Sequence, residues 1–414
     1  MSNNILVVGG GAAGCIAAAA AAENGCKVTL IEANERIGRK VMITGKGRCN
    51  LTNYQTDVRG LIDNCPVNGR FLYGAFSKFM PQDVMDLFES YGVPLKVTRG
   101  NRVFPVSDKS VDIVDAMDRM LKKNHVRRKH GRAVHLIITD GAVTGVQLES
   151  GESLKGDAVI LCTGGLSYPR TGSNGDGYKL AEEAGHSVTA LTPSLIPLVS
   201  NDPDCSAMMG LSLKNVGVTL ISSGSSKPVY EDFGELLFTH FGVSGPTVLS
   251  ASSHIPEFGK DKYKLIIDWK PALDRDKLDQ RIQRDFKEKS NKDFQNSLSG
   301  LLPLKAVPVF VKKSGIEPTK KVNQISREER EHLVELLKNY SIPLTGFRPI
   351  AEATVTSGGI PVKEIDPKTM ESRLMPGLYF AGEVIDVDAY TGGYNLQIAF
   401  STGHLAGVSV SEIY

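Results

Sequence analysis

The residues best suited to chemistry lie near the N-terminus, where three glycines in the spacing Gly9-x-Gly11-x-x-Gly14 are followed by Glu32. Gly9 permits a tight turn, Gly11 lets the backbone approach a pyrophosphate, and Gly14 allows a helix to pack closely on a strand. A helix beginning here offers free N–H groups and its positive dipole end to phosphates. Glu32 would accept hydrogen bonds from a ribose diol. The pattern predicts a dinucleotide site, and a glycine-rich turn in an ordinary βαβ unit is the alternative.

The elements needed to position these residues are all present in the local pattern. Residues 4–8 (NILVV) form a continuous apolar run that predicts a buried parallel strand, and the Ala-rich stretch after the glycines predicts a helix ending near Asn24-Gly25. The run KVTLIE predicts a second strand ending at Glu32. Together they predict a complete strand–turn–helix–strand unit.

Two further strand ends favour FAD over a nicotinamide dinucleotide as the resident cofactor. The runs DAVILCTGG (157–165) and LYFAGEV (378–384) each lead a buried strand into small residues, and the second lies late in the chain. Such a pair resembles the fingerprint of FAD proteins of the glutathione-reductase type. A helix starting near Asn395 would bring its N-terminus to the flavin and stabilise negative charge there. We therefore expect non-covalently bound FAD.

Length and composition describe an ordinary globular protein. The chain has 414 residues, 41% hydrophobic and 23% charged, which predicts two or three domains and excludes disordered and fibrous classes. A net charge of +2 gives no global argument for a nucleic-acid partner. Six cysteines without a C-x-x-C pair, and histidines in no metal-ligand pattern, predict a reduced cytoplasmic protein without a metal. The charge-free residues 5–22 contain three consecutive glycines and have no basic flank, so no membrane span or signal peptide is expected.

Shifts in composition mark the expected domain boundaries. We predict an α/β, Rossmann-type FAD-binding domain built from residues 1–190 and 345–414, into which a β-rich domain (191–272) and a charged helical domain (273–344) are inserted. Within the first domain, residues 60–130 are expected to be mainly helical and residues 133–162 to form a β-meander.

Four stretches together resemble one known family: IGRKVMITGKGRCNLTN (37–53), TGGLSYPRTGSNGDGYKLAEEAGH (163–186), ELLFTHFGVSGP (235–246) and AGEVIDVDAYTGGYNLQIAFSTG (381–403). They are similar to the bacterial flavoproteins that include BaiN-like bile-acid reductases, the proteins called aminoacetone oxidases, and the ribosomal RNA dihydrouridine synthase. The resemblance spans essentially the whole chain. It implies a glutathione-reductase-like FAD domain with inserted β-barrel-like and helical domains.

The resemblance also implies a set of cofactor contacts. They divide among the pyrophosphate (Gly9, Gly11, Ala12, Ala13, Gly14), the adenosine ribose (Glu32), the ribityl and flavin part (Lys40, Thr44, Gly45, Arg48, Asn50), the adenine edge (Val134) and the isoalloxazine (Gly382, Glu383, Asn395, Leu396). Related flavoproteins have Gly-Asp where this chain has Gly382-Glu383, so backbone contacts are expected there more than a carboxylate contact.

Cys49 is the candidate catalytic residue. Reduction of an electron-poor C=C bond needs a hydride from the flavin and a proton on the neighbouring carbon, and a thiol is able to supply that proton. We expect the adjacent Arg48 to lower the pKa of the thiol. The alternative for Cys49 is a small buried packing residue. His240, Tyr168 and Tyr390 lie in family-like motifs and either face the substrate or serve the core.

The resemblance implies reduction of an activated C=C bond with NADPH or NADH as a transient reductant. No second strand–GxGxxG–helix unit is present in the sequence to hold a nicotinamide dinucleotide. The preferred substrate is uridine in large-subunit (23S) ribosomal RNA, with the cluster HVRRKHGR (125–132) and the pairs Lys122-Lys123, Lys312-Lys313 and Lys320-Lys321 as phosphate contacts. Solvated charged faces are the alternative for these clusters. The other functions considered are an oxidase of small amines, a reductase of steroid-like small molecules, and a non-catalytic FAD-containing RNA-binding factor.

Overall fold

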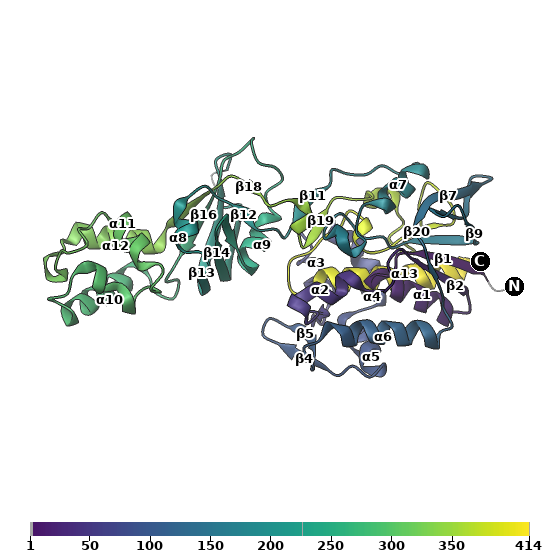
Figure 1. Ribbon diagram of the computed structural model, residues 1–414, viewed down its shortest axis with the longest axis horizontal. Helices are drawn as coiled ribbons and strands as arrows, with labels where there is room; N and C mark the ends of the chain where they lie inside the picture. The colour runs from purple at the N-terminus through teal and green to yellow at the C-terminus, as the bar shows by residue number, and fades with distance from the viewer. Residues whose placement is uncertain (1–2, 226, 414) are drawn as a thin grey trace. The chain divides into compact units, whose positions relative to one another are not determined.

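The computed structural model describes residues 3–225 and 227–413 and separates into two compact units (Figure 1). The first contains the chain up to Ser194 and from Pro349 onward, and the second is Leu195–Arg348. Both limits lie four residues later in the chain than the limits expected for the FAD-binding domain, 190 and 345. The division of the insert into separate β-rich and helical domains stays a prediction, because residues of both parts share one hydrophobic cluster.

A five-stranded parallel sheet forms the centre of the first unit. Its order is β20-β10-β1-β2-β6, with β1 (Asn4–Val8), β2 (Lys27–Glu32), β6 (Arg127–His130), β10 (Ala158–Leu161) and β20 (Leu378–Phe380). The expected strands at 4–8, 157–165 and 378–384 are confirmed. Because all five strands run in one direction, their carboxyl ends meet at one edge, where open α/β sheets bind ligands.

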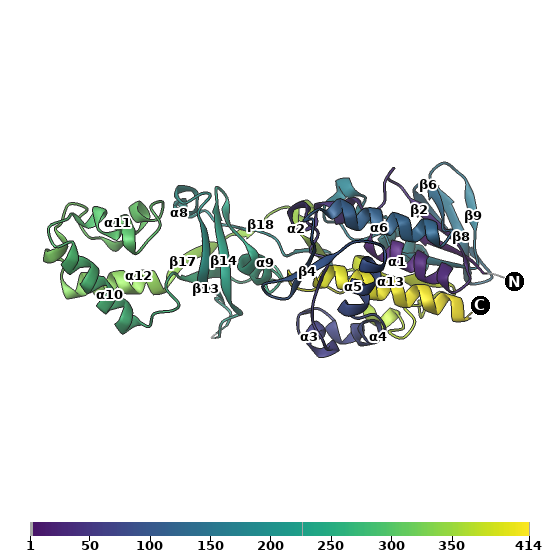
Figure 2. The same cartoon turned by 90° about the horizontal axis from the view of Figure 1, so that it is seen from below.

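Two helices from opposite ends of the chain lie side by side against this sheet (Figures 1 and 2). They are α1 (Ala12–Glu23) and α13 (Tyr394–Ile413). A methyl group on Gly403 would lie 2.4 Å from the carbonyl oxygen of Ala13, and one on Gly407 would lie 2.4 Å from that of Ala17. The charge-free, Ala-rich stretch is therefore a helix buried between a sheet and a second helix, where only small side chains fit. In the part of the chain that is described, no helix has both the length and the apolar character to cross a bilayer.

The remaining elements of the first unit surround the sheet. The helices are α2 (Arg39–Gly47), α3 (Val58–Ile62), α4 (Tyr73–Lys78), α5 (Pro81–Ser90), α6 (Ser110–Lys123) and α7 (Asp176–Glu183). The expected meander is present as β7 (Ala133–Thr139), β8 (Ala142–Leu148) and β9 (Ser153–Lys155), whereas β10 joins the parallel sheet. A short ladder pairs β11 (Thr192–Ser194) with β19 (Val355–Ser357).

Residues 60–130 are not as uniformly helical as expected. Strands β4 (Leu95–Thr98) and β5 (Arg102–Pro105) form a hairpin, and β3 (Thr52–Asn53) pairs with β5. The signal for it was Gly100-Asn101, since both residues adopt the positive φ that tight hairpin turns need. The two strands are too short for the alternation of apolar and polar residues to be distinctive.

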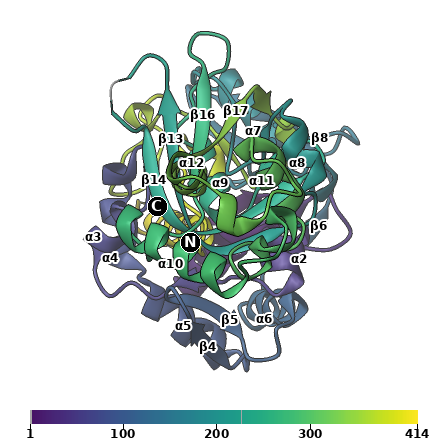
Figure 3. The ribbon, with the colours of Figure 1, turned by 90° about the vertical axis from the view of Figure 1, so that its left-hand side faces the viewer.

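The second unit contains a seven-stranded antiparallel sheet of order β17-β16-β13-β14-β15-β12-β18 (Figure 3). The strands are β12 (Leu198–Val199), β13 (Ser212–Ser222), β14 (Tyr230–Thr239), β15 (Gly242–Ser244), β16 (Tyr263–Asp268), β17 (Tyr340–Leu344) and β18 (Gly346–Phe347). The strands at the two ends of this order are separated in the chain by Thr345 alone, so the sheet curls in a barrel-like way.

The α-helices in the described part of the second unit are α8 (Pro203–Ala207), α9 (Pro246–Ser252), α10 (Arg275–Glu288), α11 (Val307–Ser314) and α12 (Arg327–Lys338). Trp269 stands between the sheet and these helices. Its ring lies 4.9 Å from that of Phe310 in α11 and 5.8 Å from that of Tyr340 in β17. These rings form an aromatic core that joins the sheet to α11.

Candidate functional site

Of the three motif glycines between β1 and the first turn of α1, Gly9 and Gly14 are closely surrounded by protein atoms, whereas Gly11 is open. A methyl group on Gly9 would lie 2.5 Å from the carbonyl oxygen of Cys162, and one on Gly14 would lie 1.8 Å from that of Gly9. A methyl group on Gly11 would meet no atom within 4 Å. The turn therefore leaves space at the position expected to face a pyrophosphate, which fits a dinucleotide.

Glu32 fastens this turn to the end of β2. Its Oε2 accepts a hydrogen bond from the Gly10 N–H at 2.7 Å, and its Oε1 accepts from the Asn34 N–H at 2.7 Å and from Asn34 Nδ2 at 2.6 Å. The carboxylate thus lies beside the turn, as a ribose ligand would need. Asn34, which sequence reasoning missed, holds the Glu32 carboxylate in place through these two hydrogen bonds.

The predicted flavin-facing loop has an unusual backbone. At Thr44 the chain leaves the helical conformation, and Gly45, Lys46, Gly47 and Cys49 all have positive φ. Lys46 and Cys49 are strained there because they carry a Cβ, and such strain clusters at ligand sites.

Asn50 follows that loop with an unsatisfied acceptor. Its Oδ1 is buried, and among the described residues it has no hydrogen-bond partner. Buried polar atoms are rarely left unpaired, so this oxygen fits a group supplied by a ligand.

The predicted flavin contacts from the C-terminal part lie at η8 (Gly382–Val384) and at the start of α13. The Glu383 carboxylate is held by the Lys40 ammonium, the Ser167 hydroxyl and the Thr356 N–H. Asn395 accepts from the Ala389 N–H at 3.0 Å and donates to the Ala389 carbonyl at 2.7 Å. Its side chain therefore fixes the segment that leads into α13.

The other expected contacts are placed as follows. Ala12 and Leu396 are half-buried, whereas Ala13, Gly14 and Gly382 are buried. Val134 is half-buried in β7, shortly after Gly131, whose N–H donates to the Glu32 carbonyl at 3.0 Å. The residue expected at the adenine edge thus follows the strand that borders Glu32.

Cys49 does not have the environment expected for an activated thiol. The residue is 0% exposed, and burial raises the pKa of the thiol to about 12. The expected lowering of this pKa by Arg48 is wrong. Arg48 is exposed, and its guanidinium lies 4.6 Å from the centre of the Phe104 ring. A thiol without accessible surface cannot touch a ligand in this conformation, so the geometry favours the alternative of a small packing residue, and the proton-donor role is tested by substitution.

The three secondary candidates are dispersed. His240 belongs to the second unit, next to Phe241, with ring centres 5.0 Å apart. Tyr168 is 39% exposed, and the Tyr390 N–H donates to the Asn64 carbonyl at 3.0 Å.

Asp388 is a feature that sequence reasoning missed. It is 1% exposed, and burial raises the pKa of its carboxyl to about 6, opposed by the nearby Ser194 and Ser357 hydroxyls. Among the described residues, neither carboxylate oxygen has a hydrogen-bond partner in satisfactory geometry, although both serine hydroxyls lie close by. The available signal was an Asp between a strand end and a helix start, in the motif 381–403.

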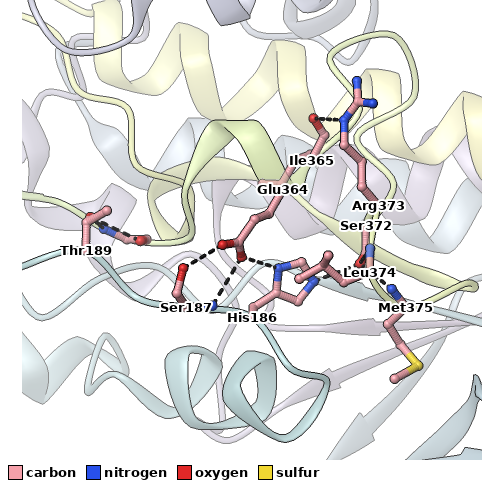
Figure 4. Close-up of polar contacts among 10 residues, drawn as sticks. His186, Ser187, Thr189, Glu364, Ile365, Ser372, Arg373, Leu374 and Met375 are labelled. Atoms are coloured by element: carbon pink, nitrogen blue, oxygen red, sulfur yellow. Dashed lines mark hydrogen bonds and ion pairs between the residues drawn. The ribbon is translucent and has the colours of Figure 1, made fainter.

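A separate polar cluster joins His186 to Glu364 and Ser372 (Figure 4). His186 Nδ1 lies 3.0 Å from Glu364 Oε2, and Nε2 lies 2.7 Å from Ser372 Oγ. This order matches a nucleophile triad, but Ser372 Oγ also accepts from the Leu374 and Met375 N–H groups. Since the His186 side chain is 0% exposed, the cluster is a structural clamp. Within residues 3–225 and 227–413, no group of three or more His, Cys, Asp or Glu side chains is arranged to hold a metal.

Comparison with known proteins agrees with this architecture. The family model described as "HI0933-like protein Rossmann domain" matches residues 3–409. A 3-dehydro-bile acid delta(4,6)-reductase of Clostridium scindens is 30% identical over 394 residues, 94% of each chain. A ribosomal RNA dihydrouridine synthase of Escherichia coli is 30% identical over 381 residues, 91% of this chain and 90% of the other. The solved 3-ketosteroid delta1-dehydrogenase of Sterolibacterium denitrificans shares the fold, with a TM-score of 0.54 over 100% of both chains at 13% identity. The chain belongs to the HI0933-like Rossmann family of FAD-dependent oxidoreductases.

Proposed function

We propose that this protein binds FAD non-covalently at the carboxyl edge of its parallel sheet and reduces a C=C bond conjugated to a carbonyl group, with NADPH or NADH as the reductant. The observation that carries the proposal is the glycine turn, which is closed at Gly9 and Gly14, open at Gly11 and bordered by Glu32. The names of both relatives describe hydrogen added to an unsaturated ring.

The chain's own groups have distinct tasks in this proposal. The α1 N-terminus and the Gly11 backbone hold the pyrophosphate, while Glu32 orients the ribose and the Val134 backbone meets the adenine edge. Bound FAD supplies a carrier that accepts and returns a hydride.

The flavin end is served by two regions of the chain. One region is α2 and the loop after it, with Lys40, Thr44, Gly45, Arg48 and Asn50, and the other is η8 and the start of α13, with Gly382, Glu383, Asn395 and Leu396. The positive N-terminal end of α13 stabilises negative charge placed beside it.

The preferred substrate is uridine in large-subunit ribosomal RNA, and the name of the Escherichia coli relative supports uridine in ribosomal RNA as the substrate class. The uracil C5=C6 bond is conjugated to a carbonyl, so it meets the chemical requirement. The second candidate is a small cyclic enone, favoured by the name of the Clostridium scindens relative.

The deciding experiment records the flavin absorbance of the purified protein under anaerobic conditions, before and after NADPH and then NADH. Bleaching is expected. The reduced protein is then given unmodified 23S ribosomal RNA or a 3-keto-4-ene steroid, and the product is examined by mass spectrometry for two added hydrogens. A flavin that stays oxidised with both nucleotides but is bleached by small amines, with peroxide released in air, would contradict the proposal and identify an oxidase.

A further inference from the structure

The basic clusters expected to bind RNA phosphates are largely neutralised within the protein. Arg128 pairs with Asp118 at 2.5 Å and Lys129 with Glu152 at 2.5 Å. Arg132 donates to both oxygens of Asp176 at 2.7 Å. In the second unit, the pairs Lys313–Asp204, Lys320–Glu329 and Lys321–Asp293 are equally close. These cations already have anionic partners.

Four other basic side chains have no such carboxylate partner among the described residues. Lys46 and Arg48 in the flavin-facing loop, and Arg99 and Arg102 in the β4–β5 hairpin, are all exposed. Throughout the described ranges, none of the four has a carboxylate within 4.0 Å. We call this group the hairpin surface. Its charge is free to attract a polyanion.

The members of the hairpin surface are held together by the hairpin itself. Arg102 and Phe104 lie on the same face of β5, since alternate residues of a strand point the same way. Arg48 stacks over the Phe104 ring, and the Arg102 Nε donates to the Arg99 carbonyl at 3.1 Å. The Arg48 and Arg102 side chains are thus each held by a contact within the protein.

The hairpin surface borders the candidate site. Asn53 Nδ2 donates to the Gly100 carbonyl at the hairpin tip and to the Gly392 carbonyl just before α13, both at 3.1 Å. A methyl group on Gly45 would lie 3.4 Å from the Phe104 ring, so the loop and the hairpin are in contact. In Figure 1, α2 and the two hairpin strands lie at the same end of the first unit.

We propose that the hairpin surface binds the phosphates of the RNA strand on either side of the reacting nucleotide. The inference rests on the proposed function and names the contacts of its preferred substrate. Arginine suits this task because its planar fork matches phosphate oxygens. Exposed cations contribute through counterion release, which makes the binding strongly dependent on salt.

The test uses Arg99→Gln/Arg102→Gln, because neither residue belongs to the proposed FAD contacts. Binding of fluorescein-labelled oligouridine and of unmodified 23S ribosomal RNA is measured by anisotropy and filter binding over a range of NaCl concentrations. Loss of two phosphate contacts should make the slope of log affinity against log salt shallower by about 1.4. FAD content and NADPH-driven bleaching should match the unaltered protein.

The matched control is Arg128→Gln/Lys129→Gln, which removes the same charge from the neutralised cluster and should leave the slope unchanged. An unchanged slope in the hairpin variant, with the unaltered protein still reducing RNA, would overturn the proposal that the hairpin surface binds RNA phosphates and leave the proposed function standing. A raised KM for NADPH with unchanged RNA binding would assign these arginines to the reductant and also overturn it. Failure of the unaltered protein to bleach would count against the proposed function itself.

Discussion

Lys40 and Glu383 are 343 positions apart in the chain, yet the Lys40 Nζ lies 2.7 Å from Glu383 Oε2. Their side chains are 22% and 19% exposed, so water screens the pair only in part. Two residues expected to contact the flavin independently are therefore partners of each other. The pair joins α2 to η8.

Glu383→Gln should weaken both folding and FAD binding. The change removes the charge opposite Lys40 and leaves a partly buried ammonium without its anion, a loss of about 1–3 kcal/mol in the free energy of unfolding. Thermal unfolding and FAD content per chain measure the two effects. Glu152→Gln, which breaks the Lys129–Glu152 pair, is the control and should leave FAD content unchanged. Full FAD content in Glu383→Gln would remove the pair from the cofactor site.

Gly11→Ala should separate folding from cofactor binding. The added methyl group meets no protein atom within 4 Å, so the FAD-free protein should unfold at the same temperature, whereas FAD affinity should fall because the methyl occupies the space left for pyrophosphate. Gly346→Ala, also without neighbours within 4 Å, should change neither property. An unaltered dissociation constant for FAD in Gly11→Ala would show that the open side of the turn faces something else.

Glu32→Ala should release FAD while the fold is retained. The substitution removes the proposed ribose ligand and an acceptor of three hydrogen bonds. Asn34→Ala is the informative companion, because it removes the brace but keeps the carboxylate, and it should retain more FAD. Equal FAD loss in both variants would mean that Glu32 acts only by holding the turn.

Cys49→Ala tests the remaining catalytic candidate. Because the thiol is fully buried, we expect unchanged turnover with the unsaturated substrate and a stability loss of about 1 kcal/mol. In the unaltered native protein, an aromatic disulfide reagent should modify the half-buried Cys26 faster than Cys49. Flavin bleaching at the normal rate combined with slowed substrate reduction would restore the thiol as the proton donor.

Asp388→Asn should stabilise the protein at neutral pH. The pKa of this carboxyl is about 6 in the folded state, above the ordinary value of 3.8, so the buried charge opposes folding fully above about pH 6, and this penalty shrinks as the pH falls from that value toward the ordinary pKa. The gain above pH 7 should reach roughly 3 kcal/mol and vanish near pH 4. Chemical denaturation at several pH values measures it. Asp140→Asn, which removes an exposed carboxylate at a turn, should show no such trend. A gain that is independent of pH would mean that Asp388 is not charged at neutral pH.

Local features of the sequence determined the dinucleotide unit. The apolar run of β1, the glycine spacing and the acidic end of β2 are each set by steric and hydrogen-bonding demands within a few residues. For the same reason the strand ends at 157–165 and 378–384 and the helix from Asn395 were predictable.

Only the tertiary structure decided which charged and polar groups meet. Arg128, Lys129 and Arg132 are neutralised, whereas the cations of the hairpin surface are not. The two groups differ because Asp118, Glu152 and Asp176 pair with the first group alone. Burial likewise set the pKa of Cys49, which its neighbour Arg48 in the chain suggested wrongly. Pairing and desolvation depend on residues distant in the chain, so a local pattern carries no information about them.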